Sequence, residues 1–163
     1  MPDLELSEVI ALMLAAGGPR GQLARVRWPL HKALRELHET AGRSGHRSVL
    51  GSSWRLRPSA DHGVEVVGAD AAIRRLVDVG LLRGEGQLRQ ASYRVDDEAV
   101  ISWRRRLMTL DAEHVQLLQR AGTRWAAMAS TAAKNRSAPA RSSASMVTSA
   151  TPNRESWPVA EEA

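Results

Sequence analysis

Arginine side chains are the groups in this sequence whose type and spacing could do chemistry. Only Lys32 and Lys134 among the 23 basic residues are lysines, so guanidinium groups carry nearly all the positive charge. A guanidinium is a planar fork of N–H donors that matches phosphate oxygens and the edge of guanine. Residues 20–57 contain nine basic residues and two glutamates, a net charge of +7, whereas residues 59–98 contain five arginines and eight acids, a net charge of −3. This separation of charge is typical of a surface that binds nucleic acid.

The sequence contains no set of residues that indicates catalysis or metal binding. It has no cysteine, which excludes thiolate nucleophiles, cysteine metal sites and disulfides. It also has no Gly-x-Ser-x-Gly motif, and the run Asp96-Asp97-Glu98 is better explained as a helix start, where the helix dipole favours acids. His31 and His38 share a helical face but have no third ligand. We therefore expect no enzymatic activity, no cofactor and no metal site.

Nothing in the sequence indicates insertion into a membrane. No apolar stretch is long enough to cross a bilayer, and Asp3, Glu5 and Glu8 stand before the apolar run 9–16 in place of a basic leader. A cytoplasmic protein without a membrane partner is the expectation.

Hydrophobic periodicity predicts the elements that position the first group of basic residues. A mostly buried helix is expected from an N-cap at Ser7 to a stop at Gly17-Gly18-Pro19. A second helical pattern spans residues 20–42, although Pro29 should kink it or split it at Trp28. Turn residues and short alternating runs in the following segment, residues 43–68, favour two short strands or a ragged hairpin.

The middle of the chain predicts a helix that runs into a β-hairpin. The stretch "GADAAIRRLVDVGLL", residues 68–82, has the pattern of a helix with Asp70 as N-cap and Gly80 at the C′ position. A strand from Leu81, a turn at Gly84-Glu85-Gly86 and a second strand in "QASYRV" complete the expected hairpin.

Two more helices are expected after the hairpin, each beginning behind an aspartate. Asp96 or Asp97 would cap a helix over residues 98–110, and Asp111 would cap another over residues 112–128. At the first of these helices, the positive end of the helix dipole would also stabilise Asp96, Asp97 and Glu98.

The C-terminal residues differ in composition from the rest of the chain. Beyond Ser130 they are mainly Ala, Ser, Thr and Pro without an apolar pattern, which predicts a disordered tail. The expected organisation is therefore one domain over residues 1–130 and a tail over residues 131–163.

The central helix and hairpin together resemble part of a known family. The stretch "AAIRRLVDVGLLRGEGQLRQASYRVDDEAV", residues 71–100, looks like the recognition helix and wing of winged helix-turn-helix regulators, especially the ArsR-like and MarR-like groups. The shared features are a Leu-x-x-x-Gly-Leu ending from Leu76 to Leu81, a basic hairpin, and Tyr93-Arg94-Val95-Asp96 before an acidic helix start.

This resemblance implies a mainly α fold with a small β-hairpin wing, in other words an α+β winged helix-turn-helix domain followed by C-terminal helices. It also implies a DNA-binding transcriptional regulator of prokaryotic type, with double-stranded DNA as its partner and a place at the nucleoid. We expect a homodimer whose terminal helices, residues 98–130, pair so that two wings meet successive half-sites. The sequence does not indicate an effector.

Two different helices are candidates for reading DNA. The first is the helix over residues 69–80, in which Arg74 and Arg75 would contact bases or phosphates. The arginines of the hairpin would support it from the flank, and they are Arg83, Arg89 and Arg94.

The alternative reader is the basic segment over residues 20–42, which also resembles the two-helix reader of a helix-turn-helix. In this case His31, Lys32 and Arg35 would contact DNA. The first placement is favoured because only there does a helix that ends in glycine run straight into a hairpin. It departs from the family at Asp70, since a carboxylate at the start of the recognition helix repels DNA.

The same fold can also serve a different function. Winged-helix domains act as protein-interaction modules as well as DNA-binding domains. A module of this kind, without sequence-specific DNA binding, is the alternative to a regulator.

Overall fold

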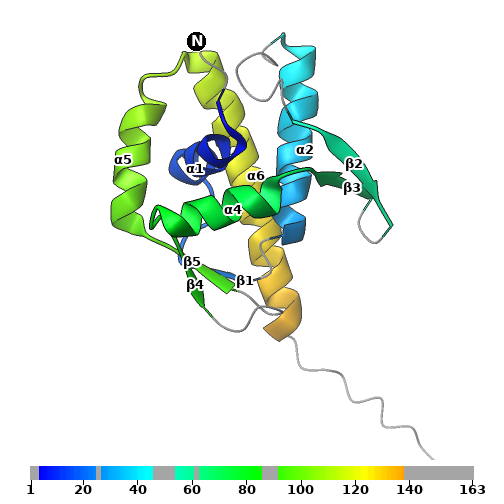
Figure 1. Cartoon of the computed structure of the whole chain (residues 1–163), viewed down its shortest axis with the longest axis vertical. Helices are drawn as coiled ribbons and strands as arrows, with labels where there is room; N and C mark the ends of the chain where they lie inside the picture. The colour runs from blue at the N-terminus through cyan, green and yellow to red at the C-terminus, as the bar shows by residue number, and fades with distance from the viewer. Residues whose placement is uncertain (1–3, 25–26, 46–53, 61–62, 86–91, 138–163) are drawn as a thin grey trace, which may run out of the picture.

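Helix α1 (Leu6–Ala16) lies at the centre of the molecule, and the other elements are arranged around it (Figure 1). All its side chains from Val9 to Ala15 are buried, because α4, α5 and α6 pack against it from different sides. The computed structural model describes residues 4–24, 27–45, 54–60, 63–85 and 92–137. Within these residues the chain is mainly helical with two small antiparallel sheets, as the sequence predicted for an α+β fold.

The elements follow one another in an order that alternates helices with short strands. After α1 come β1 (Gln22–Ala24), α2 (Arg27–Arg43), β2 (Leu56–Ser59), β3 (Gly63–Val66), α4 (Ala69–Asp78), β4 (Leu82–Glu85), β5 (Ser92–Val95), α5 (Asp97–Leu107) and α6 (Ala112–Ser137). One sheet has the strand order β1-β5-β4, and the other is the β2–β3 hairpin.

The start of α1 differs from the expected N-cap at Ser7. Glu5 is the N-cap, since its side chain accepts a hydrogen bond from the backbone of Glu8 while the Glu8 carboxylate accepts one from the Glu5 N–H at 3.0 Å. This reciprocal pair is a capping box, which satisfies two otherwise unpaired donors. The helix therefore begins before Ser7, and it ends at Gly17 as predicted.

A close backbone contact joins α1 to the long helix α6. A Cβ placed on Gly122 of α6 would lie 2.4 Å from the Met13 carbonyl oxygen and 3.0 Å from the Gly18 nitrogen. One turn further along, Trp125 is completely buried. Only glycine lets the two backbones approach this closely.

The expected single helical pattern over residues 20–42 is wrong at its beginning. Residues 22–24 form strand β1, which pairs with β5 so that Leu23 lies opposite Tyr93 and is buried. The helix α2 starts at Arg27, which places Pro29 in its first turn. A first-turn N–H has no partner within the helix, so proline neither kinks nor splits α2. Because residues 22–24 form a strand, this segment does not have the two helices of the alternative helix-turn-helix reader.

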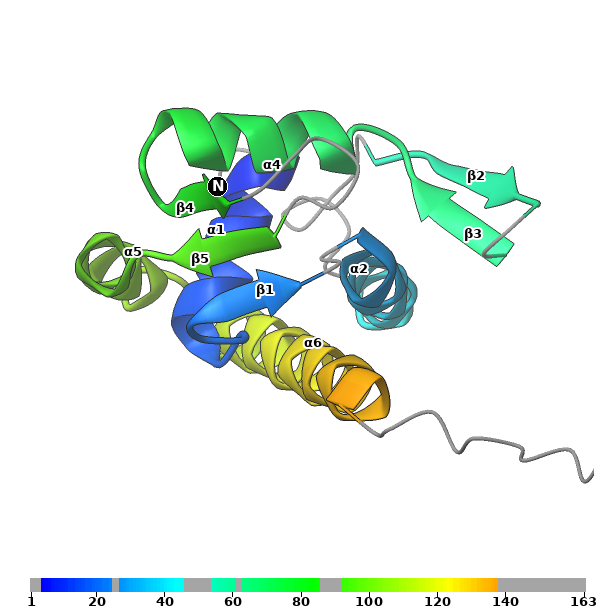
Figure 2. The same cartoon turned by 90° about the horizontal axis from the view of Figure 1, so that it is seen from below.

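The hairpin predicted in residues 43–68 is present as β2 and β3. Leu56 pairs with Val66, and Ser59 pairs with Gly63. The hairpin stays attached to α2 through a buried hydrogen bond of 2.9 Å, which the Val66 N–H donates to Nδ1 of His31. It therefore projects from the helical body between α2 and α4 (Figure 2).

Helix α4 ends as the sequence predicted but begins differently. The N–H groups of Gly80 and Leu81 donate to the carbonyls of Val77 and Leu76, each at 3.0 Å, and Gly80 has φ of 77°. This is a Schellman motif with glycine at C′. The N-cap, however, is Gly68, and Asp70 lies inside the first turn.

The hairpin after α4 is longer in its first strand than expected. Gly84 and Glu85 belong to β4, so the predicted turn does not begin at Gly84. The rest of that turn, with Arg89, falls in residues 86–91, outside the described residues. The predicted second strand corresponds to β5.

The last two helices begin where the sequence predicted. Asp96 is the N-cap of α5, and its side chain accepts a hydrogen bond from the Ala99 N–H at 3.0 Å. Asp111 directly precedes α6, and its carbonyl accepts from the Val115 N–H. Helix α6 continues to Ser137, beyond the domain boundary expected at residue 130, and residues 138–163 of the expected tail lie outside the described residues.

No helix in the described part of the chain has the length and apolar character needed to cross a membrane.

Candidate nucleic-acid interface

The exposed face of the β1-β5-β4 sheet carries the arginines that the sequence assigned to a wing. Arg83 on β4 lies directly opposite Arg94 on β5, and Arg94 lies opposite Gln22 on β1. The neighbouring pair, Leu82 and Val95, is buried on the inner face. Because side chains alternate between the two faces of a sheet, burial of the apolar pair directs both guanidinium groups outward.

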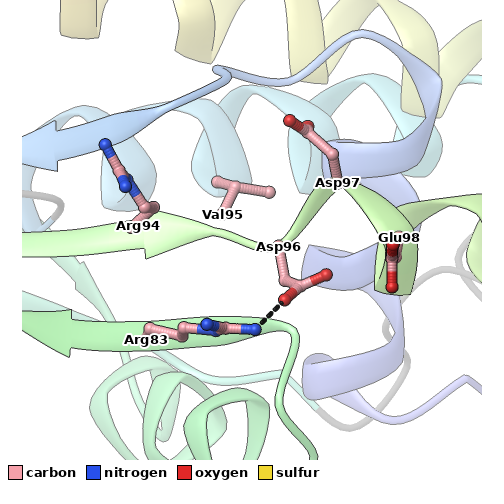
Figure 3. Close-up of a pocket in the computed structure, with 6 residues that line it drawn as sticks. All are labelled: Arg83, Arg94, Val95, Asp96, Asp97 and Glu98. Atoms are coloured by element: carbon pink, nitrogen blue, oxygen red, sulfur yellow. Dashed lines mark hydrogen bonds and ion pairs between the residues drawn. The ribbon is translucent and has the colours of Figure 1, made fainter.

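Two like charges directly opposite each other destabilise a sheet unless a counter-charge is near. Here Asp96 provides it, since Arg83 donates a hydrogen bond of 2.6 Å to Oδ2 of Asp96 (Figure 3). The hydrogen bond from the Ala99 N–H, and then that from Arg83, hold the pKa of Asp96 below its ordinary value of 3.8. In Figure 3, Arg94 projects away from this ion pair, toward β1.

A third arginine, Arg20, extends the basic face toward helix α5. Its pKa is lowered first by partial burial and then by the nearby Arg104 guanidinium, while Asp97 acts in the opposite direction. Gly21, next to Arg20 in the chain, accepts a hydrogen bond of 3.1 Å from the Val95 N–H, so Arg20 lies next to the end of β5. We call Arg20, Arg83 and Arg94 the arginine cluster.

The sequence placed Arg20 only within a charge total, the net charge of +7 over residues 20–57. Recognising Arg20 as part of a site requires knowing that residues 22–24 form a strand next to β5. The three-residue strand has no period long enough to show this. Arg20 was therefore missed because its signal is tertiary.

Carboxylates share the depression with the arginine cluster. Asp96, Asp97 and Glu98 line it together with Arg83, Arg94 and Val95. They are explained by the start of α5, where acids are favourable. The depression is thus of mixed charge, and its acids belong to the helix that follows the wing.

The two arginines of α4 differ in their surroundings. Arg75 donates a hydrogen bond of 2.6 Å to Oε2 of Glu5, so its charge is compensated within the molecule. Arg74 is exposed and makes no ion pair with the residues that the structure describes. Asp70 and Asp78 lie one turn before and after Arg74 on the same exposed face, which gives this face both signs of charge.

The structure corrects the assignment of His31 as a DNA contact. Its side chain is only 3% exposed, and its Nδ1 accepts the buried hydrogen bond from Val66. His31 therefore connects α2 to β3 and does not face solvent. Lys32 is exposed on the same helix, and Arg35, also exposed, pairs with Glu39 at 3.0 Å.

The two wing arginines Arg83 and Arg94 lie opposite each other, whereas the two candidate reader helices, α4 and α2, pack on different elements. Helix α4 contacts α1 and β4, whereas α2 packs on α6 and β3. Figures 1 and 2 show α4 lying over the sheet and α2 beside α6. Arg74 and Arg75 are thus on the helix that leads directly into the β4–β5 hairpin, while Lys32 and Arg35 are on α2, which packs mainly on α6 and β3.

Asp96 gives the site a testable dependence on pH. Its lowered folded-state pKa means that the charged carboxylate stabilises the fold above the ordinary pKa, and this contribution disappears as pH falls through the folded-state value. Asparagine is an equally good N-cap but lacks the charge that attracts Arg83. We expect Asp96→Asn to lower the melting temperature at pH about 7, and the difference from the unmodified protein to shrink toward pH about 2. Thermal unfolding of both proteins across this range measures it, and a difference independent of pH contradicts the role given to the charge.

Neither a metal site nor a similarity to a known protein adds to the geometry of this interface. Among the described residues, no three His, Asp or Glu side chains are grouped so that they could hold a metal ion. No protein-family model, curated protein or solved structure gave a significant match to the chain.

Proposed function

We propose that this protein is a winged-helix regulator that binds duplex DNA, with the arginine cluster on the phosphate backbone. The observation that carries the proposal is the pairing of Arg83 with Arg94 on the exposed face of a sheet whose hairpin directly follows α4. Guanidinium groups on a projecting hairpin can reach phosphates, which supply most of the affinity of proteins for DNA.

The strand order supports a winged-helix arrangement. The hairpin β4–β5 follows α4 through the Schellman turn, and β1, from before α2, completes the sheet on the far side of β5. This resembles a wing anchored to a helical body. One departure is large, because the β2–β3 hairpin stands between α2 and α4, where a helix-turn-helix has a short turn.

Helix α4 is the proposed partner of the wing on DNA. It contacts β4, and Arg74 on its outer face makes no ion pair with a described residue. Asp70 and Asp78 lie on the same face and repel phosphates, so this face would make few contacts with DNA. Arg75 would contribute only by exchanging Glu5 for a phosphate. Base readout by α4 therefore rests on Arg74, and affinity rests on the arginine cluster.

A homodimer belongs to the proposal because two equivalent wings would meet two half-sites of a palindromic operator. The candidate surfaces are those of the helices after the wing, α5 and α6, as expected from the sequence. Both present exposed side chains that no described element covers.

The second candidate function, a protein-interaction module, is favoured by one observation. The outer face of α4 carries as many acids as arginines, and one of those arginines is already paired with Glu5. Such a face suits a polar protein surface as well as a phosphate backbone.

Titration of the full chain against random-sequence duplex DNA at low and moderate salt separates the two functions. We expect binding at about 50 mM salt that weakens steeply toward about 200 mM, because phosphate contacts release counterions. A protein of similar size and opposite net charge serves as the control for nonspecific retention. Absence of binding at low salt contradicts the regulator and leaves the interaction module, since unspecific attraction to phosphates is strongest there.

A further inference from the structure

Arg83, one of the arginines assigned to DNA, already has an anionic partner within the protein. Its guanidinium donates a hydrogen bond of 2.6 Å to Oδ2 of Asp96, and Arg94 lies directly opposite it in the sheet. A phosphate oxygen is an acceptor of the same kind as a carboxylate oxygen, so a phosphate and Asp96 compete for one guanidinium. The ion pair therefore opposes the contact that the interface would make with DNA.

Asp96 is held in place by two hydrogen bonds that do not involve Arg83. Its Oδ1 accepts from the Ala99 N–H at 3.0 Å, and its own backbone N–H donates to the Leu81 carbonyl at 3.0 Å. The Asp96 side chain is 17% exposed, whereas that of Arg83 is 72% exposed. Because exposed side chains change rotamer readily, Arg83 is the partner that can move and the carboxylate is the one that stays.

The Asp96 carboxylate is charged under all conditions in which DNA binding is normally measured. The hydrogen bond from the Ala99 N–H, and then that from Arg83, hold the pKa of Asp96 below its ordinary value of 3.8. Near neutral pH the carboxylate therefore attracts Arg83 and also repels phosphates. Asp96 opposes DNA in these two ways, and an experiment must separate them.

We propose that Asp96 is a built-in competitor of DNA, whose carboxylate holds Arg83 until a phosphate replaces it and so lowers the affinity of the interface. This inference rests on the proposed function, since it concerns the same arginine. The counter-charge of Asp96 lets Arg83 and Arg94 face each other in the free protein, where two unshielded like charges destabilise a sheet. Asp96 thus stabilises the free protein and weakens its complex with DNA.

The ion pair between Arg75 and Glu5 is a weaker competitor of the same kind. Glu5 also caps a helix, α1, and accepts a hydrogen bond of 2.6 Å from Arg75, but both side chains are 65% exposed. Solvent and salt screen an exposed pair of this kind strongly. We therefore expect Glu5→Gln to change the affinity for DNA less than a substitution of Asp96 does.

Titration of the full chain with random-sequence duplex DNA at neutral pH and about 0.1 M salt tests the competition. We expect Asp96→Asn to tighten binding by about tenfold, because Arg83 then reaches a phosphate without giving up a partner. Asp96→Ser, a second uncharged N-cap, should have the same effect, which excludes a new contact between the asparagine and DNA.

Glu98→Gln is the matched control for the loss of one negative charge. Glu98 lines the same depression as Asp96 and makes no ion pair with the residues that the structure describes. Its substitution removes repulsion of phosphates but releases no arginine, so it should tighten binding by about twofold at most. Circular dichroism at the temperature of the titration checks that every variant is folded, since Asp96→Asn is expected to lower the melting temperature.

An Arg83→Gln background shows whether Asp96 acts through Arg83. Asp96→Asn added to Arg83→Gln should tighten binding no more than Glu98→Gln does, because no guanidinium is left to release. Absence of binding by every variant contradicts the proposed function, and the inference with it. If the unmodified chain binds and Asp96→Asn improves binding no more than Glu98→Gln does, the inference alone is overturned. An equally large gain in the Arg83→Gln background also overturns it, since the effect would then be repulsion between Asp96 and phosphates.

Discussion

Gly122→Ala is expected to lower the melting temperature by roughly 10 °C, although alanine normally stabilises a helix. In an exposed helix this change gains up to about 1 kcal/mol. Here the added Cβ would lie 2.4 Å from the Met13 carbonyl oxygen and 3.0 Å from the Gly18 nitrogen. Both atoms belong to backbone at the end of α1, so no side-chain rotation relieves the clash. We expect the two helices to move apart, which should lower the free energy of unfolding by about 3 kcal/mol.

Thermal or denaturant unfolding measures this effect, with Ser130→Ala as the control. Ser130 is exposed on the same helix α6, so its replacement should be neutral or slightly stabilising. If Gly122→Ala is as stable as the unmodified protein, α1 and α6 do not cross at this point. A large drop in stability supports a close crossing, because only that makes the sign of a helical glycine substitution reverse.

Removing the arginine cluster is expected to weaken DNA binding by roughly a hundredfold at about 0.1 M salt. The variant carries Arg20→Gln, Arg83→Gln and Arg94→Gln, which keeps long polar side chains but removes three positive charges. If each arginine neutralises a phosphate, the slope of log affinity against log salt should become shallower by about 0.9 for each of these arginines. All duplex sequences should be weakened alike, because phosphates carry no sequence information.

The matched control removes the same charge from α2 through Lys32→Gln, Arg35→Gln and Arg43→Gln, three exposed positions. The melting temperatures of the α2 variant and the cluster variant should be compared first. The cluster variant also loses the ion pair between Arg83 and Asp96, which could change its stability. We expect the α2 variant to keep most of the affinity and most of the salt slope. If its affinity falls further than that of the cluster variant, α2 is the DNA-binding surface and the role of the wing is wrong. Equal reductions at both surfaces would indicate attraction by net charge alone.

Several element boundaries could be predicted from the sequence. Asp96 caps α5 and Gly80 ends α4, because both act through hydrogen bonds or backbone angles within a few residues. The hairpin pattern that ends at Val95 and the buried run of α1 are equally local. These features are predictable because the interacting groups are neighbours in the chain.

Local patterns gave wrong predictions where another set of contacts replaced the expected one. Ser7 is a good N-cap, but the reciprocal bonds of Glu5 and Glu8 start α1 earlier. Leu23 fits the helical spacing of the following leucines, yet it belongs to a strand because β5 offers it backbone hydrogen bonds and a buried position. His31 falls on a basic helix, but the hairpin returns over it and takes its Nδ1 as an acceptor.

The candidate site was therefore only half determined by the sequence. Arg83 and Arg94 could be placed on one hairpin, because their strands are joined by a short connection. Three arrangements depend on the tertiary structure: the segment of Arg20 reaches the end of β5, Asp97 lies with Arg83 and Arg94, and Arg75 is paired with Glu5. Each of these depends on contacts between segments far apart in the chain, and side-chain type and spacing do not encode which distant segments meet. That choice is made by the burial of α1, against which α4, α5 and α6 must all pack.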